Sequence, residues 1–179
     1  MSREVIPTGA SSSVVQSTPR EVPYDDGTHW RALLGFIIIS MDLVMEENIH
    51  RLSPVGVGSS VTRLNSPNDC NVETLAAQIN GMAEAASILQ PQARPSVVCY
   101  ACTSGSIVIG EDKVRAEIQR GAPWAKPATL VTGVVNALRR LDAQRIVVAT
   151  PYLDEINVME SVFLREKGFE VLDIQGLNV

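Results

Sequence analysis

The feature that most constrains this chain is a series of short apolar runs that alternate with helical segments. The first run, residues 33–39, is apolar throughout, which is typical of a strand covered on both faces of a sheet. Further runs follow at 97–101, 145–149 and 169–174, and residues 57–64 predict a weaker strand. Strands that alternate with helices require right-handed crossovers and form a mostly parallel sheet. The sequence therefore predicts a doubly wound α/β fold with about five strands in the flavodoxin-like order 2-1-3-4-5.

Helices are expected between these strands, from the spacing of apolar residues and from capping signals. Asn71 has a side chain suited to cap a helix, and the apolar residues after it recur on one side as far as Leu89. Gly121 and Gly168 mark the ends of two further helices. The predicted helices span 43–52, 71–89, 111–120, 129–141 and 155–167.

Composition and charge exclude several classes of protein. The 179 residues are 45% hydrophobic and 20% charged, so the chain can bury a core. A net charge of −5 argues against a broad basic face for nucleic acid, and no apolar run approaches the ~20 residues that cross a membrane. Three cysteines are too few for a disulfide scaffold, which favours reduced thiols and a cytoplasmic location.

The first 29 residues differ in composition from the rest of the chain. They combine prolines with a run of three serines and show no sustained apolar period. Such a segment cannot bury enough apolar surface to fold alone. We expect residues 1–29 to be a disordered extension and residues 30–179 to form one α/β domain.

The candidate site lies at the carboxyl ends of the strands, where open parallel sheets bind ligands. Three polar segments follow predicted strands there: Ser40 to Asp42, Cys102 to Ser104, and Thr150 to Tyr152. In the predicted strand order these three ends are neighbours. We therefore expect them to converge on one crevice.

Cys102 is the principal candidate for a reactive group. A cysteine that leaves a strand and begins a helix experiences the positive end of the helix, which favours its thiolate form. Thr103 and Ser104 offer hydroxyl and backbone N–H groups beside it, which suits a carboxylate. The alternative is that Cys102 is a small buried hydrophobe and that Thr103 and Ser104 merely cap the helix.

The other two segments supply supporting candidates. The Tyr152 phenol can hydrogen-bond an oxyanion, or it can be an ordinary aromatic at the rim. Asp42 can act as a base, as a helix cap, or as both, and capping is the simpler interpretation. Asn157 lies one turn into the next helix, where it is expected to hold the Tyr152 loop.

The remaining cysteines and the histidines offer weaker hypotheses. Cys99 and Cys102 form a C-x-x-C pattern that is typical of thiol redox modules, but Cys99 lies inside a strand and is expected to be core. Cys70 lies in a polar loop with neither a partner nor a cradle visible. His29 and His50 have no metal-ligand spacing with any cysteine, so no metal site is predicted.

Two segments resemble signatures of a known enzyme group. Residues 98–106, followed by Ile109-Gly110-Glu111, resemble the first cysteine motif of maleate cis-trans isomerases and arylmalonate decarboxylases, in the aspartate/glutamate racemase superfamily. Residues 149–157 resemble the second signature of that group, and residues 40–46 resemble its first loop. At Asp42 the maleate isomerases carry asparagine, whereas the ectoine-utilisation branch carries aspartate.

The resemblance implies a fold of two similar halves that face each other, with one catalytic cysteine from each half. It implies that Cys102 is the nucleophile or acid/base of the first half and that no metal or organic cofactor takes part. Thr103, Ser104 and Tyr152 would hold a substrate carboxylate, and Asp42 would line the pocket. An intact cysteine at Cys102 favours isomerase, racemase or ectoine-utilisation chemistry over the decarboxylases.

The likeness covers only the first half of the family's length, since the second cysteine motif lies beyond residue 174. Cys70 is not expected to substitute, because no cradle adjoins it. The chain is therefore expected to be incomplete, weakly active or inactive alone, and to associate through apolar surface that the second half would cover. The expected partner is a small dicarboxylate or amino-acid derivative, with no nucleic acid or membrane, and the apolar surface could also pair two copies of the chain as a homo-oligomer. The alternatives are a carboxylate-binding remnant, an arylmalonate decarboxylase-like lyase and a C-x-x-C redox module.

Overall fold

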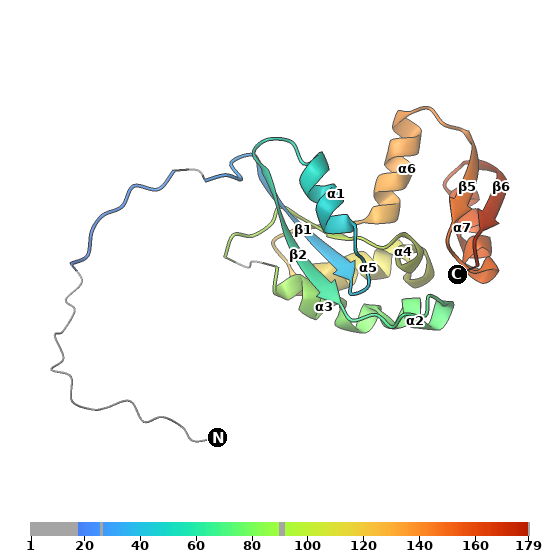
Figure 1. The fold of residues 1–179 in the computed structure, drawn as a ribbon, viewed down its shortest axis with the longest axis horizontal. Coiled ribbons are helices and arrows are strands. Elements are labelled where there is room, and N and C mark those ends of the chain that lie inside the picture. The colour runs from blue at the N-terminus through green and yellow to red at the C-terminus, as the bar shows by residue number, and fades with distance from the viewer. Residues whose placement is uncertain (1–17, 26, 90–91, 179) are drawn as a thin grey trace, which may run out of the picture.

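The computed structural model describes residues 18–25, 27–89 and 92–178. Most of the predicted disordered extension, residues 1–17 and 26, lies outside the described residues. Residues 18–25 and 27–29 are exposed and contain neither helix nor strand. The first strand begins at Ala32, shortly after them (Figure 1).

A four-stranded parallel sheet forms the centre of the molecule. Its strands are β1 (Ala32–Ile39), β2 (Val57–Leu64), β3 (Val97–Tyr100) and β4 (Lys126–Thr129), in the order β2-β1-β3-β4. All neighbouring pairs are parallel. The α/β class, the mostly parallel sheet and the order of its first three strands are confirmed.

The predicted strand order is wrong beyond β3. The place beside β3 is taken by the unpredicted strand β4, whereas β5 (Arg145–Thr150) and β6 (Glu170–Gly176) form a separate two-stranded parallel sheet. β4 has no apolar run, and it contains Pro127, which a sheet tolerates at its edge. Sequence pattern therefore could not reveal it.

Seven helices connect and cover the strands of the described chain. α2 and α3 divide the predicted helix 71–89 at Gln78, which is buried, and Asn71 caps α2 by accepting from the Thr74 backbone N–H at 2.9 Å. In Figure 1, α3 lies on one side of β1 and β2 and α1 on the other. The helices are α1 (Met45–Leu52), α2 (Val72–Ala77), α3 (Ile79–Ser87), α4 (Thr103–Ile109), α5 (Glu111–Gly121), α6 (Leu130–Arg140) and α7 (Asp154–Glu166).

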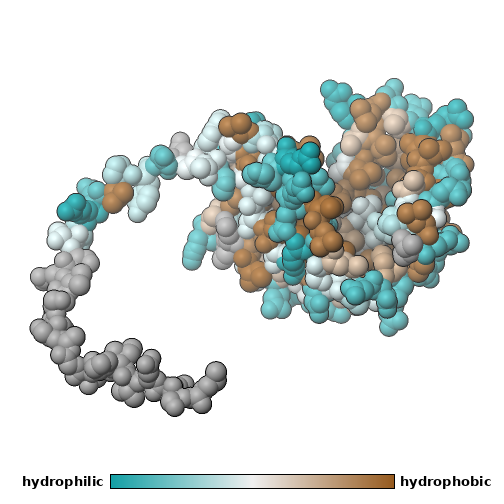
Figure 2. All heavy atoms as spheres, viewed as in Figure 1, coloured by the Kyte–Doolittle hydropathy of each residue, from teal (hydrophilic) through white to brown (hydrophobic). Residues whose placement is uncertain are grey.

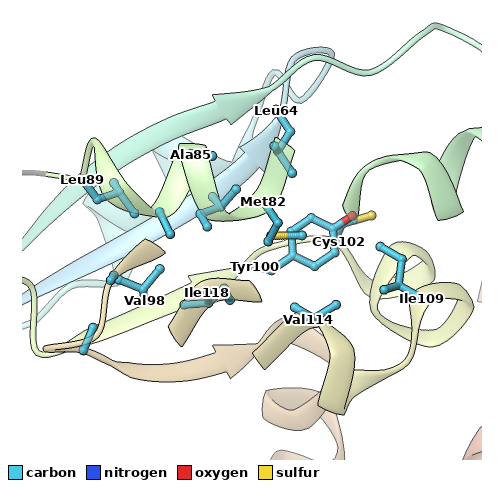
Figure 3. Packing of buried hydrophobic residues seen from close by; sticks show 14 of the residues in the cluster. Leu64, Met82, Ala85, Leu89, Val98, Tyr100, Cys102, Ile109, Val114 and Ile118 are labelled. Carbon is cyan, nitrogen blue, oxygen red and sulfur yellow. The ribbon is translucent and has the colours of Figure 1, made fainter. Parts of the chain in front are cut away.

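The main core lies between this sheet and helices α3 and α5. Ile37, Met82, Val98, Tyr100 and Ile118 are fully buried within it. Burying each such side chain contributes about 1.5–3 kcal/mol. Figure 3 shows Tyr100 and Cys102 close together at one end of this core, so the candidate site begins where the core ends.

The region of β5, β6 and α7 has its own small core and more exposed apolar surface. Val135, Leu164, Phe169 and Val171 form that core, whereas Val147 on β5 is 72% exposed. Apolar surface is visible over this part of the molecule in Figure 2. None of the helices in the described chain is both long enough and apolar enough to cross a membrane.

Candidate active site

A pocket of about 230 Å³ opens at the carboxyl ends of β1 and β3. The three segments that the sequence singled out all reach it, although the third comes from β5 in the other sheet. We call it the Cys102 pocket. It is lined by Ile39, Met41, Asp42, Ser66, Asp69, Cys70, Leu75, Gln78, Ala101, Cys102, Thr103, Ser104, Leu130 and Tyr152.

Cys102 caps helix α4 with its own sulfur. Its backbone is extended at the end of β3, and its Sγ accepts a hydrogen bond from the Gly105 backbone N–H at 3.3 Å. The Ser104 hydroxyl lies 3.6 Å from the same sulfur. The side chain is 8% exposed, so its reactive atom faces the pocket rather than bulk solvent. Donors directed at a sulfur stabilise negative charge on it.

Gly105 makes this arrangement sterically possible. A Cβ at Gly105 would lie 2.1 Å from the Tyr100 hydroxyl oxygen and 3.1 Å from the Cys102 sulfur. The first separation is too short for any side chain. Glycine therefore lets the first turn of α4 approach both the tyrosine and the cysteine.

Thr103 and Ser104 form the start of α4 beside the thiol. As the first residues of the helix they have backbone N–H groups that no carbonyl of the same helix can accept. Ser104 is 2% exposed, and both residues line the Cys102 pocket. The two N–H groups and the Ser104 hydroxyl are donors of the kind that hold a carboxylate.

Tyr152 reaches the pocket on a turn that Asn157 secures. The Asn157 amide donates to the Tyr152 carbonyl at 3.2 Å, and its oxygen accepts from the Thr150 hydroxyl at 2.5 Å. Burial raises the pKa of the Tyr152 phenol, a hydrogen bond with Ser104 opposes the rise, and the neighbouring Cys102 adds to it. The phenol is thus kept protonated, as a donor, beside the thiol.

Asp42 both caps a helix and lines the pocket. Its Oδ1 accepts from the backbone N–H groups of Val44 at 2.9 Å and Met45 at 2.8 Å, just before α1. Arg63 holds the same loop by donating to the Asp42 carbonyl at 2.8 Å. The carboxylate therefore faces the pocket from a fixed loop.

A chain of polar side chains beneath the pocket was not predicted. The Tyr100 hydroxyl donates to the Gln78 side-chain oxygen, and the Gln78 amide donates to the Ser66 hydroxyl at 3.1 Å. Ser40 in turn accepts from the Ser66 backbone N–H at 3.0 Å. This chain ties the ends of β1, β2 and β3 to the break between α2 and α3.

Cys70 also lies in the Cys102 pocket, contrary to the expectation that it has no partner. It precedes α2 and packs against the same core cluster that contains Cys102. Burial raises the pKa of the Cys70 thiol, the neighbouring Cys102 raises it further, and a hydrogen bond with Ser104 opposes the rise. Cys70 follows β2 at the same edge of the sheet, but a loop separates it from the strand, so the sequence carries no signal that places it in the pocket.

Cys99 occupies a different place, although it forms the C-x-x-C pattern with Cys102. It lines a separate groove on the sheet, with Leu34 and Phe36, and its Sγ lies 3.6 Å from the Tyr100 carbonyl oxygen. Burial raises its pKa to about 12. The structure thus does not bring Cys99 and Cys102 to one pocket.

The charged side chains that line the Cys102 pocket, among the residues that the structure describes, are all acidic. Asp42 and Asp69 line it, and no lysine or arginine does. A carboxylate bound there would depend on hydroxyl and backbone N–H donors. Across residues 18–25, 27–89 and 92–178, no three His, Cys, Asp or Glu side chains gather as a metal site would require.

A larger cavity of about 510 Å³ lies beside α5, α6 and α7 and contains a dense set of ionic contacts. Glu111 accepts from Lys167 at 2.6 Å, from Arg115 at 2.9 Å and from the Thr132 hydroxyl. Burial raises the pKa of Glu111, but these hydrogen bonds and charges outweigh it, so the net pKa is lowered. We call Glu111, Arg115, Thr129, Thr132 and Lys167 the Glu111 cluster.

Comparison with known proteins identifies relatives of this site and fold. A family model described as arylmalonate decarboxylase matches residues 68–179. The maleate isomerase of Nocardia farcinica is 27% identical over 157 residues, which cover 82% of this chain and 62% of that enzyme. The chain thus spans less than two thirds of the length of the relatives it matches.

Solved structures of these enzymes share the fold. The maleate isomerase of Pseudomonas putida S16 superposes with a TM-score of 0.70 at 22% identity, covering 83% of this chain and 64% of that one. The Nocardia farcinica isomerase with a covalently bound succinylcysteine intermediate gives 0.73 at 23% identity, with the same coverage. A double mutant of arylmalonate decarboxylase in the liganded form gives 0.70 at 23% identity, covering 83% and 63%.

Proposed function

Because the chain belongs to the arylmalonate decarboxylase family, in the aspartate/glutamate racemase superfamily, we propose that the Cys102 pocket performs cofactor-independent chemistry on a small carboxylate. The observation that carries this proposal is the Cys102 sulfur, which accepts from the Gly105 N–H at 3.3 Å inside a pocket rich in donors. The three free cysteines suit a reducing, cytoplasmic setting.

The proposed reaction is isomerisation of a cis-dicarboxylate such as maleate. One substrate carboxylate binds the N–H groups of Thr103 and Ser104 and the phenol of Tyr152. The Cys102 sulfur adds to the alkene carbon farther from this bound carboxylate, a C–S bond forms, and the electron pair of the double bond moves into the bound carboxylate as an enediolate. Rotation about the resulting single bond and expulsion of the sulfur restore the alkene in the trans form.

Electrostatics of the pocket support the part assigned to its donors. The raised pKa of Tyr152 keeps the phenol protonated at neutral pH, so it can donate to the negative charge that develops on the carboxylate. A phenol that keeps its proton at neutral pH is not available to accept a proton from the substrate. Each acid–base group typically contributes about 10²–10⁴-fold to a reaction rate. Because the Tyr152 phenol keeps its proton and does not act as a base, we propose that residues 1–179 alone turn over substrate slowly.

A second candidate substrate class is favoured by the acidic lining of the pocket. Asp42 and Asp69 would attract an ammonium group and disfavour a second carboxylate. An amino-acid derivative, with one carboxylate at Thr103 and Ser104 and an ammonium near Asp42, satisfies both ends of the pocket. In that case Cys102 acts on the proton of the α-carbon as an acid/base.

The test is to incubate the chain with maleate and measure covalent modification. Intact mass spectrometry and peptide mapping should find a succinyl adduct on Cys102, a step that the described pocket can support. Cys102→Ser should abolish the adduct, and Cys99→Ser, the matched control in the neighbouring strand, should keep it. An adduct on Cys99, or one that persists in Cys102→Ser, contradicts the proposal.

The same samples separate the alternatives. Deuterium exchange at the α-carbon of amino-acid derivatives, lost in Cys102→Ser, would indicate racemase-type chemistry. Release of carbon dioxide from aryl-substituted malonates would indicate a decarboxylase. Saturable binding of malonate with neither adduct nor exchange would indicate a carboxylate-binding protein.

A further inference from the structure

Two of the three cysteines share one pocket, and they are not the pair that the sequence spacing suggests. Cys70 and Cys102 both line the Cys102 pocket, whereas Cys99 lines the groove on the sheet. The helices that begin directly after them, α2 and α4, pack against each other. Residues 32 positions apart in the sequence (102 − 70 = 32) are thus held together by the fold.

Ser104 connects the two thiols. Its hydroxyl lies 3.6 Å from the Cys102 sulfur. Cys70 lies close enough to Ser104 and to Cys102 for both to affect the pKa of its thiol, which Ser104 lowers and Cys102 raises. Cys70, Cys102 and Ser104 therefore lie near one another in the lining of the same pocket.

The segment that carries Cys70 is the more adaptable side of the pair. Residues 65–71 contain neither helix nor strand, whereas Cys102 is fixed by its hydrogen bond from Gly105 and by the start of α4. A short irregular segment can adjust its backbone more easily than a helix terminus. A movement of Cys70 towards Cys102 would therefore involve this segment and not the strands of the sheet.

We propose that Cys70 and Cys102 form a redox-active dithiol, in which a hydroperoxide converts the Cys102 pocket reversibly to a disulfide. The Cys102 thiolate attacks the distal oxygen of the peroxide, the O–O bond breaks, and Cys102 becomes a sulfenic acid as hydroxide or alkoxide leaves. The Cys70 sulfur then attacks the Cys102 sulfur, an S–S bond forms, and water leaves with the Cys70 proton. The sulfurs lose two electrons in total, and the peroxide accepts them.

The electrostatics of the pair favour these two steps in this order. Burial and the neighbouring Cys102 both raise the pKa of Cys70, so Cys70 stays a neutral thiol. The Cys102 sulfur accepts from the Gly105 N–H at the start of α4, so we expect Cys102 to react first. Oxidation of Cys102 to an uncharged sulfenic acid removes one of those two causes. Cys70 then ionises more readily and becomes the attacking thiolate.

The disulfide would close the pocket to substrate and protect its nucleophile. Sulfenic acids with no neighbouring thiol proceed to sulfinic and sulfonic acids, which do not revert with ordinary reductants. With Cys70 alongside, oxidation stops at a state that thiols reduce. The proposal concerns oxidation alone, so it does not depend on which substrate the pocket accepts.

The test is to treat the 179-residue chain with hydrogen peroxide, block free thiols with N-ethylmaleimide and map the peptides without reductant. Trypsin is unsuitable, because Arg94 precedes Pro95 and all three cysteines stay on one peptide. A glutamate-specific protease cuts after Glu73 and Glu84 and separates Cys70 from the other two. Chymotrypsin then cuts after Tyr100 and separates Cys99 from Cys102.

The linked peptide should join Cys70 to Cys102, and Cys99 should carry the maleimide. Cys70→Ser should lose the link and accumulate sulfinic acid on Cys102, whereas Cys99→Ser, the control, should form the link as before. Dithiothreitol should restore free Cys102 in the unmodified chain and not in peroxide-treated Cys70→Ser. Far-UV circular dichroism checks that each variant is folded.

Two results would overturn the inference. One is overoxidised Cys102 in the unmodified chain with Cys70 still free, and the other is a Cys99–Cys102 link as the main product. The maleate adduct at Cys102 is measured separately on reduced protein. An adduct without the Cys70–Cys102 link would refute this inference alone, and a link without the adduct would refute the proposed isomerase chemistry alone.

Discussion

The Cys102 pocket and the Glu111 cluster are the two polar centres of this chain, and they differ in how their groups are satisfied. The carboxylate of Glu111 is bonded to two cations and to the Thr132 hydroxyl. The Cys102 sulfur has one backbone donor at 3.3 Å and one hydroxyl at 3.6 Å. The first centre is internally neutralised, whereas the second keeps a nucleophile with donors still available.

The difference shows that cavity size is a poor guide to chemistry in this fold. The cavity at the Glu111 cluster is the larger, about 510 Å³ against about 230 Å³. Its contacts connect α5 to α6 and to the end of α7, so they fix the β5–β6 unit against the main sheet. We therefore propose that the Glu111 cluster contributes stability and that the Cys102 pocket carries out the reaction.

The largest stability effect is expected from Glu111→Gln. The amide removes the charge that pairs with Lys167 and Arg115, so the free energy of unfolding should fall by about 1–3 kcal/mol at pH 7. Urea denaturation measures it, with Glu117→Gln as control, since among the described residues Glu117 pairs with the exposed Arg120 of the same helix and with no other cation. A loss of thiol reactivity at Cys102 in folded Glu111→Gln would contradict the separate roles of the two centres.

Acid titration sharpens the same prediction. The folded-state pKa of Glu111 is lowered, so its stabilising contribution is complete above the unfolded value of about 4.3 and is lost as pH falls through the folded pKa. Between pH 7 and pH 3 the unmodified chain should therefore lose more stability than Glu111→Gln. Equal losses in the two proteins would remove Glu111 from the account.

A smaller effect is expected from Tyr152→Phe in the Cys102 pocket. Loss of the phenol donor to a carboxylate should weaken malonate binding by about threefold to tenfold, or about 0.7–1.4 kcal/mol. Calorimetric titration measures this affinity. Tyr24→Phe is the control, because Tyr24 is exposed and does not line the Cys102 pocket. Unchanged affinity in Tyr152→Phe would mean that the phenol does not contact the ligand.

The smallest effect is expected from Glu160→Gln, with a pH dependence opposite to that of Glu111. Glu160 is 8% exposed, its Oε2 has no hydrogen-bond partner among the described residues, and burial raises its pKa. Ionisation of Glu160 is therefore less favourable in the folded state than in the unfolded state. Its cost to the free energy of unfolding begins above the unfolded pKa of about 4.3 and grows as the pH rises towards the folded pKa.

Glu160→Gln should therefore raise the free energy of unfolding by up to about 1 kcal/mol at pH 7 and leave it unchanged near pH 3. Urea denaturation at both pH values checks this, with Glu84→Gln on the exposed face of α3 as control. Destabilisation at pH 7 would show that Glu160 has a partner in solution.

The sequence predicts those parts of the fold that have their own apolar pattern. β1 and β3 are predicted from their apolar runs and β2 from a weaker pattern, and the order of these three strands is confirmed. β4 is four residues long and contains a proline, so only its hydrogen bonds to β3 make it a strand. Its insertion displaces β5 and β6 into a second sheet.

The candidate site was predictable where it lies directly after a strand. Asp42, Cys102 and Tyr152 follow β1, β3 and β5 and reach one pocket. Cys70 and Gln78 were missed, because they lie beyond a loop and at a helix break whose positions depend on packing between α2 and α4. A pattern along the chain cannot show which loop folds back over a strand end.

The central claim is that the Cys102 thiol and its adjacent donors act together on a carboxylate. The most direct test compares the rates at which iodoacetate, which carries a carboxylate, and neutral iodoacetamide alkylate each cysteine. At Cys102 the rate of alkylation by iodoacetate should saturate with reagent concentration and should fall when malonate is added. The ratio of the iodoacetate rate to the iodoacetamide rate should be higher at Cys102 than at Cys99. A linear iodoacetate rate at Cys102, insensitive to malonate and with the same ratio as at Cys99, would contradict the account.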